Sequence, residues 1–257
     1  MSVLFNIKEN VAYIQFNRPK AFNSFNRKQA LSLIDRLQDC ADNESIRTIV
    51  IRGSGKAFCA GQDLVEATDD NGITFERILT EHYNPIIRTI RNLPKPVIAM
   101  VNGVAAGAGA NIAFCCDFTI AASSAIFTQA FSKIGLVPDS GGTLIIPRLV
   151  GLQRATAMMM LSNKITASEA VDMGLIYQSV ADDALEHTVH QLATKLAKMP
   201  TKALGMTKQL INAGLSNTLD QQLDMEGSFQ VEASETADYK EGVAAFLEKR
   251  PPVFTGK

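Results

Sequence analysis

Two loops rich in glycine and alanine are the parts of this sequence best suited to chemistry. Residues 57–64 (AFCAGQDL) and 102–109 (NGVAAGAG) each follow an apolar run. Small side chains let a ligand reach the backbone, and the second loop leads into a predicted helix whose N-terminus offers free N–H groups. Two such donors converging on one oxygen would form an oxyanion hole, suited to a thioester carbonyl that becomes an enolate. Tight helix–sheet packing would need the same small residues, so the loops alone leave both interpretations open.

Other familiar chemistries lack their usual patterns. Residues 53–56 (GSGK) have neither the spacing of a P-loop nor the Ser or Thr that follows its lysine. Gly107 and Gly109 could begin a dinucleotide-binding turn, but Ile112 occupies the third glycine position. No GxSxG motif occurs, and His187 and His190 stand three residues apart without further ligands. We therefore predict no metal site and no nicotinamide or serine-hydrolase chemistry.

Composition excludes several classes of protein. The 257 residues contain 25 Lys and Arg against 26 Asp and Glu, and a net charge of −1 argues against a nucleic-acid binder. Hydrophobic residues make up 46%, enough for a large core and too much for a disordered chain. The four cysteines form no CxxC pair, which argues against a disulfide framework or a zinc site. The first ten residues lack the pattern of a secretory signal, so we expect a cytoplasmic protein.

An uncharged stretch, residues 97–116, is long enough to span a bilayer. Its alanines, glycines and two asparagines (Asn102 and Asn111) make it weakly hydrophobic on insertion scales. We therefore expect a buried strand over 97–101, a turn at Asn102-Gly103 and a helix of small residues, with no membrane association.

The pattern of elements predicts an α/β fold followed by a helical region. Strands are expected at 3–7, 11–16, 48–52, 97–101, 118–121 and 177–180, with helices at 27–41 and 75–91 between them. After Asp139 the pattern favours helices, at 141–149, 152–161, 167–173, 183–198, 202–213, 218–233 and 237–248. No linker separates independent domains.

Several ordered motifs carry a resemblance that covers essentially the whole chain. They are residues 17–24 (NRPKAFNS), 57–64, 94–99 (PKPVIA) with the glycine-rich turn, 135–143 (GLVPDSGGT) and 241–250 (EGVAAFLEKR). With them the chain resembles the crotonase superfamily, the enoyl-CoA hydratase/isomerase family. The resemblance implies a spiral of ββα units over residues 1–195 and a helical trimerisation region over 196–257, within one structural unit. It also implies a homotrimer or a dimer of trimers, an acyl-CoA substrate and no separate cofactor, since coenzyme A is part of the substrate.

The resemblance also assigns roles to individual residues. The oxyanion donors would be the backbone N–H groups of Ala60 and Ala108. The remaining predicted CoA and acyl contacts are Ala21, Gly61, Gln62, Asp63, Leu64, Gly107 and Phe131, with Lys249 expected to reach the CoA phosphates of a neighbouring subunit.

Departures from the family pattern favour one reaction over another. Hydratases of this family add water with two glutamates, whose positions here are Asn111 and Phe131. Neither side chain can transfer a proton as a carboxyl does, and losing such assistance costs about 10²–10⁴-fold per group. Asp139 matches the aspartate that moves a proton in isomerase branches, although it could also simply begin a helix. An apolar pocket would raise its pKa and a helix N-terminus would lower it, so the direction is open.

We therefore predict an isomerase that moves a double bond. Residues 136–143 and 234–242 (SETADYKEG) are most similar to the ring-1,2-epoxyphenylacetyl-CoA isomerase branch of phenylacetate breakdown, which also converts 3-enoyl-CoA to 2-enoyl-CoA. An isomerase of fatty-acid metabolism is the related alternative. Two further alternatives remain: an enoyl-CoA hydratase that uses Asp139 alone, and a non-catalytic acyl-CoA-binding subunit.

Overall fold

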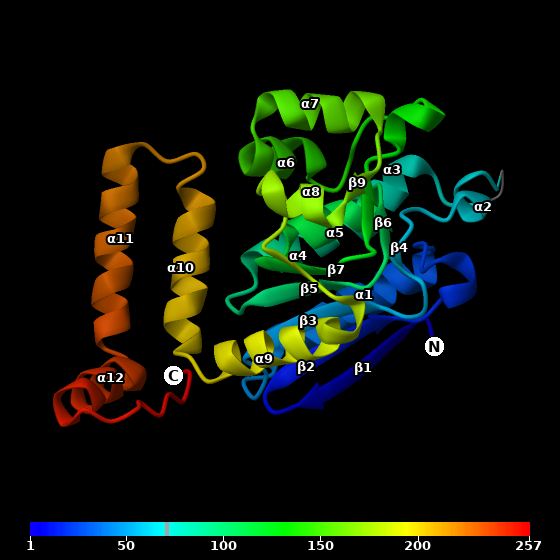
Figure 1. Ribbon diagram of the computed structural model, residues 1–257. Coiled ribbons are helices and arrows are strands. Elements are labelled where there is room, and N and C mark those ends of the chain that lie inside the picture. The colour runs from blue at the N-terminus through cyan, green and yellow to red at the C-terminus, as the bar shows by residue number, and fades with distance from the viewer. Residues whose placement is uncertain (70–71) are drawn as a thin grey trace.

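A six-stranded sheet forms the body of the molecule, in a computed structural model that describes residues 1–69 and 72–257 (Figure 1). Its strand order is β1-β2-β3-β5-β7-β10. The first two strands form an antiparallel hairpin and the following neighbours are parallel. The strands are β1 (Val3–Lys8), β2 (Val11–Phe16), β3 (Thr48–Gly53), β5 (Val97–Val101), β7 (Phe118–Ala122) and β10 (Gln178–Val180).

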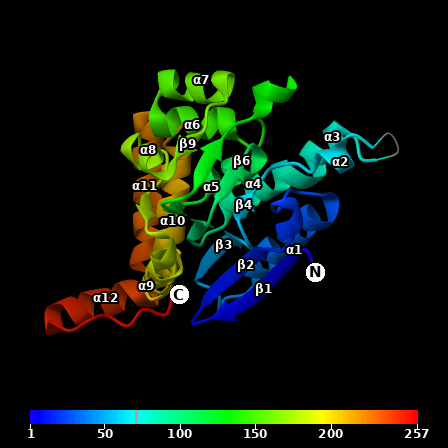
Figure 2. The same cartoon turned by 45° about the vertical axis from the view of Figure 1, so that its right-hand side comes forward.

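The central strands are buried on both faces. Every residue of β5 is buried, and β3 is buried except for Arg52. This is why residues 97–101 read as a continuous apolar run, as strands of a covered parallel sheet do. In Figure 2, α9 (Leu185–Ala197) lies on one side of the sheet and α1 (Arg27–Asp42) on the other.

A second, four-stranded sheet was not predicted. It consists of β4 (Ala57–Cys59), β6 (Val104–Ala106), β8 (Ile126–Thr128) and β9 (Ile165–Thr166), paired in that order. These strands are two or three residues long, too short to give a periodic pattern. Because β4 and β6 are parallel neighbours, the two glycine-rich loops that continue from them lie side by side.

Helices surround the two sheets and continue beyond them. They are α2 (Leu64–Ala67), α3 (Phe75–Arg77), α4 (Asn84–Asn92), α5 (Ala108–Cys115), α6 (Gly142–Val150), α7 (Leu152–Leu161) and α8 (Ala167–Asp172). Single turns of 3₁₀-helix occur at η1 (Pro19–Ala21), η3 (Phe131–Ile134) and η4 (Asp182–Ala184). The helix expected over 75–91 is divided, because a π-helix, η2 (Ile78–Tyr83), separates α3 from α4.

The C-terminal region consists of helices that extend away from the sheets. α10 (Thr201–Ala213) lies beside α11 (Leu219–Ser234), and α12 (Ala237–Glu248) extends outward at their base (Figures 1 and 2). The boundary expected after residue 195 falls in the last turn of α9. The prediction of an α/β fold followed by a helical region is confirmed. Among the described residues, no helix is both long and apolar enough to cross a bilayer.

Candidate active site

Most of the predicted site residues line one cavity. Its volume is about 300 Å³, and its wall is mainly apolar. The predicted residues among its lining are Ala60, Gly61, Gln62, Leu64, Gly107, Ala108, Phe131 and Asp139. The loop after β4, the start of α5, the turn η3 and the segment before α6 thus meet around one space. Leu136 is part of the apolar wall, whereas its neighbour Val137 is 81% exposed.

Gly61 allows the two glycine-rich loops to touch. Its φ is +91°, a conformation that L side chains rarely adopt. A Cβ atom at this position would lie 2.9 Å from the carbonyl oxygen of Ala106 and 3.7 Å from the backbone nitrogen of Ala108. The backbone of the first loop therefore lies directly against the beginning of α5, and only glycine fits there.

The backbone N–H of Ala60 is already used within the protein, which corrects the assignment of this residue as an oxyanion donor. It donates to the carbonyl of Phe22 at 3.0 Å. Phe22 and Asn23 are both left-handed, with φ of 49° and 56°, so the chain turns at this carbonyl. The side-chain amide of Asn23 fixes the turn by donating to the carbonyls of Ser54 and Ala57.

Gln62, two residues later, has the available N–H. The carbonyl of Gly61 accepts a hydrogen bond from Phe25 N–H at 2.7 Å, and the N–H of Asp63 donates to Phe25 at 2.8 Å. Because the carbonyl and N–H of a trans peptide point in opposite directions, the N–H of Gln62 faces away from Phe25. Within the described residues it has no acceptor.

The second donor is the N–H of Ala108 at the start of α5. Gly107 precedes it with φ 51° and ψ −128°, and its own N–H donates to Thr128. The first hydrogen bond of the helix is donated by Asn111 to the carbonyl of Gly107, so Ala108 lies in the first turn, where N–H groups lack intrahelical acceptors. The predicted role of Ala108 therefore agrees with a free donor at the cavity wall.

Asp63, in the first glycine-rich loop, and Ala21 are not among the residues that line the cavity. The Asp63 carboxylate accepts from the Arg18 guanidinium at 2.7 Å and from the N–H of Val65 at 3.1 Å. Ala21 ends the turn η1 that precedes Phe22. The ion pair ties the first glycine-rich loop to the segment that carries Arg18 and Ala21. CoA contact by Ala21 and Asp63 remains a prediction.

Asp139 is the carboxyl group in the cavity wall. Burial raises its pKa above the ordinary value of 3.8, while a hydrogen bond from the Ser140 hydroxyl, at 2.7 Å, opposes the rise. α6 begins only at Gly142, and no side chain caps it, so Asp139 is not the cap of this helix. The sequence left open whether an apolar pocket raises the pKa of Asp139 or a helix N-terminus lowers it. Burial is the larger effect, so the pKa is raised.

Asn111, which the resemblance places where hydratases carry a glutamate, has two hydrogen-bond partners for its side-chain amide. Its Nδ2 donates to the backbone carbonyl of Asp139 at 2.8 Å, and its Oδ1 accepts from Nε2 of Gln129 at 2.9 Å. Asn111 and Gln129 are each 1% exposed. The pair holds the segment carrying Asp139 against α5, and neither amide can take up a proton.

Tyr83 also lines the cavity, and sequence reasoning missed it. It lies at the end of η2 and is 1% exposed, and its hydroxyl donates to Oε1 of Gln62 at 2.8 Å. The apolar spacing over 75–91 fits an ordinary helix, and no signal in it marks a π-turn. Other residues of the wall that were not singled out are Phe75, Ile78, Gln129, Ala130, Lys133 and Ile134.

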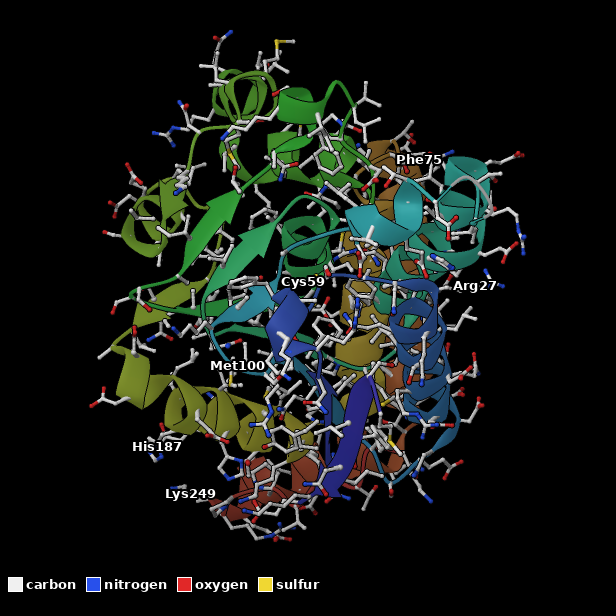
Figure 3. The ribbon with its side chains drawn as sticks, turned by 90° about the vertical axis from the view of Figure 1, so that its right-hand side faces the viewer. Arg27, Cys59, Phe75, Met100, His187 and Lys249 are labelled. Atoms are coloured by element: carbon white, nitrogen blue, oxygen red, sulfur yellow. The ribbon has the colours of Figure 1, made fainter. Side chains whose placement is uncertain are left out.

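Lys249 lies far from this cavity in its own chain. It follows α12, and Figure 3 shows it at the bottom of the molecule, with Phe75 near the top and Cys59 about midway between them. Its predicted contact with a neighbouring subunit's ligand remains a prediction. Within residues 1–69 and 72–257, no group of three or more His, Cys, Asp or Glu side chains could hold a metal ion.

Short, mostly parallel strands, a helix N-terminus and a carboxyl group thus meet around one apolar cavity. The family model "Enoyl-CoA hydratase/isomerase" matches residues 6–257, and the chain belongs to this family.

Three relatives show the range of activities named within the family. The chain is 47% identical to the 1,2-epoxyphenylacetyl-CoA isomerase of Escherichia coli K12, over 99% of this chain and 98% of that protein. It is 46% identical to a Rhodobacter capsulatus protein named "probable enoyl-CoA hydratase", over 100% and 98%. The crystal structure of an enoyl-CoA hydratase from Bacillus anthracis superposes with a TM-score of 0.93 at 32% identity, covering all of both chains. The fold expected from the resemblance is thus confirmed.

Proposed function

We propose that this enzyme moves a double bond along the acyl chain of a CoA thioester, converting 3-enoyl-CoA to 2-enoyl-CoA. The observation that carries the proposal is Asp139, the one carboxyl group among the described residues that line the cavity, which also presents the N–H groups of Gln62 and Ala108. The chain's membership of the enoyl-CoA hydratase/isomerase family supports a CoA thioester as the substrate.

The two backbone donors hold the thioester oxygen. Hydrogen bonds from Gln62 and Ala108 draw negative charge toward this oxygen, so the neighbouring C2–H bond becomes more acidic. Fixed donors in an apolar space stabilise such charge strongly, and losing one typically costs about 10²–10³-fold in kcat. The rigid positions of Gly61 and Gly107 keep the donors in place before the substrate binds.

Asp139 then transfers the proton. Its carboxylate removes a proton from C2, leaving a dienolate whose charge rests on the thioester oxygen. The resulting carboxylic acid returns that proton to C4, and the double bond moves from C3–C4 to C2–C3. Burial raises the pKa of Asp139, which brings its basicity closer to that of a useful acid–base group at neutral pH.

Hydration is the second candidate, because relatives at 46% and 34% identity carry hydratase names. Water addition benefits from one group that activates the water and another that protonates the acyl chain. Here Asn111 is engaged with Asp139 and Gln129, and Phe131 is apolar, so the second group is missing. We therefore place hydration below isomerisation.

Besides linear 3-enoyl groups, we propose a cyclic acyl group, the ring 1,2-epoxide of phenylacetyl-CoA, which the enzyme would isomerise to the oxepin-CoA. Support comes from the E. coli isomerase at 47% identity and from the aromatic side chains Phe75, Tyr83 and Phe131 in the cavity wall. Such side chains give a cyclic acyl group a large apolar surface to pack against.

Two separate assays test the reaction class. With a 3-enoyl-CoA, the wild type is expected to produce the conjugated 2-enoyl thioester, whereas crotonyl-CoA should be hydrated slowly or not at all. Asp139→Asn should abolish turnover while CoA thioesters still bind. Rapid hydration of crotonyl-CoA without isomerisation would support the hydratase instead, and turnover unaffected by Asp139→Asn would exclude the proposed mechanism.

For assembly we propose a homotrimer or a dimer of trimers built through the C-terminal helices. α11 contains no buried residue, and its Leu219, Leu223 and Val231 are each more than half exposed. Covering this apolar surface with further copies of the chain would remove it from water.

A further inference from the structure

Tyr83 reaches the cavity because the chain makes a π-turn before it. The N–H of Asn84 donates to the carbonyl of Leu79, five residues earlier, and the π-helix buries Ile78, His82 and Tyr83. In an α-helix with 3.6 residues per turn, Ile78 and Tyr83 would lie about 140° apart around the axis. The wider turn brings both into the cavity wall, and π-turns of this kind are frequent at functional sites.

The hydroxyl of Tyr83 fixes the side chain of Gln62. It donates to Oε1 of Gln62 at 2.8 Å, while Nε2 of Gln62 donates to the carbonyl of Asp63 at 3.3 Å. Both ends of this amide are therefore held. The ring of Tyr83 also packs edge-on against Phe25, with ring centroids 5.8 Å apart.

Phe25 holds the other side of the same residue. Its N–H binds the carbonyl of Gly61, which orients the peptide group whose N–H belongs to Gln62. Backbone and side chain of Gln62 are thus fixed by two neighbours that also pack against each other. These contacts hold the Gly61–Gln62 peptide group in place, so its N–H does not rotate when it donates to the thioester oxygen.

We propose that Tyr83 is a positioning residue, which aims the oxyanion donor of Gln62 through the side chain of that residue. This inference rests on the proposed function, because it assumes that the Gln62 N–H binds a thioester oxygen. Tyr83 acts here only as a hydrogen-bond donor. Burial raises the pKa of its phenol well above 10, so the group stays protonated throughout the working pH range.

Two variants and one matched control test the proposal. Tyr83→Phe removes the hydroxyl and keeps the ring, and Gln62→Leu removes its acceptor but keeps the backbone N–H. Each is expected to lower kcat for isomerisation about tenfold with KM changed less than twofold, less than the loss of a whole donor. The double variant should be no worse than either single one, because both break the same contact. The pH profile should keep its shape.

Tyr13→Phe is the control. Tyr13 likewise has a hydrogen-bonded hydroxyl, to His190 at 2.7 Å, but it lies on β2 outside the cavity. This variant should leave kcat and KM unchanged.

A spectroscopic measurement separates this inference from the reaction class. Hexanoyl-CoA is saturated and cannot react, so the carbonyl stretching frequency of the bound thioester reports hydrogen bonding alone. We expect the frequency to be lowered on the wild type and on Asp139→Asn, and less so on Tyr83→Phe and Gln62→Leu. Equal frequencies on all folded variants, or additive losses of kcat in the double variant, would overturn the role of Tyr83. The inference would survive a finding that the enzyme hydrates rather than isomerises.

Discussion

The sheets and the C-terminal helices of this protein differ in how far their residues are buried. In the sheet region, strands such as β5 are buried along their whole length, and glycines are placed where a Cβ would collide with backbone. In α11 every residue has some exposure, and Gly227 has open space around it. The side chains of Phe246 and Leu247 on α12 are 82% and 74% exposed.

We assign the chemistry to the buried sheet region and the proposed assembly to the exposed C-terminal helices. Every residue to which we assign a chemical step lies before Ser140, within the spiral of short strands and its connecting loops. The helices after α9 contribute no residue to the cavity. Substitutions in the first region should therefore change turnover, whereas those in the second should change association or stability.

Among the variants that compare the two regions, the largest effect is expected from replacing one glycine with alanine in each region. Gly61→Ala forces a side chain into a φ of +91° and to within 2.9 Å of the Ala106 carbonyl, so the loop must shift. Because the shift moves the Gln62 donor, kcat/KM should fall about 10²-fold, as on loss of an oxyanion donor. Gly227→Ala, inside α11, should leave kcat/KM unchanged. Equal kinetics for the two variants would contradict the separation.

The apolar surface of α11 provides the next test. Leu223→Lys places a charge on a side chain that is 53% exposed in the single chain, and Ser228→Lys places the same charge elsewhere on the helix. If α11 contacts other copies through Leu223, the first change should raise the dissociation constant at least tenfold. Sedimentation of both variants measures this. A wild type that sediments as a monomer would refute the proposed assembly.

The C-terminal tail should contribute stability alone. Asp238 is 3% exposed, and its carboxylate accepts hydrogen bonds from the N–H groups of Thr255 and Gly256 at 2.6 and 2.7 Å. Asp238→Asn puts an amide N–H against one of these donors, at a cost of about 1–3 kcal/mol. For a protein of this size the melting temperature should fall by roughly 2–10 °C. The exposed Asp220→Asn serves as the control and should melt like the wild type.

The smallest effect concerns Asp139 and stability. Its pKa is raised in the folded state, so the stability linked to this group is fully present below the unfolded value of 3.8 and is lost as pH rises through the folded pKa. At pH 7 the buried carboxylate therefore destabilises the native state, and Asp139→Asn should melt at a higher temperature than the wild type. The difference should shrink as the pH falls toward 4. A gap that widens on acidification would show that the pKa is lowered instead.

Sequence patterns predicted the elements and motif residues that depend on neighbouring residues in the chain. They missed features that depend on contacts between distant residues or on an irregular helical turn. The buried strand over 97–101 and the helix of small residues after it were predicted, because both leave a composition signal. Asp139 and Ala108 were found through their place in ordered motifs. The error at Ala60 arose because the Phe22 carbonyl that accepts its N–H lies 38 residues earlier in the chain. Tyr83 was missed because the register of a π-turn cannot be read from apolar spacing.

The central claim is that one carboxyl group both removes and returns the proton. A 3-enoyl-CoA deuterated at C2, followed through a single turnover in ordinary water, tests this directly. If Asp139 transfers the proton within the apolar cavity, part of the deuterium should appear at C4 of the 2-enoyl-CoA product, and Asp139→Asn should form no product. A product formed at the normal rate by Asp139→Asn, with its new hydrogen at C4 coming from solvent, would show that another group transfers the proton and would contradict the account.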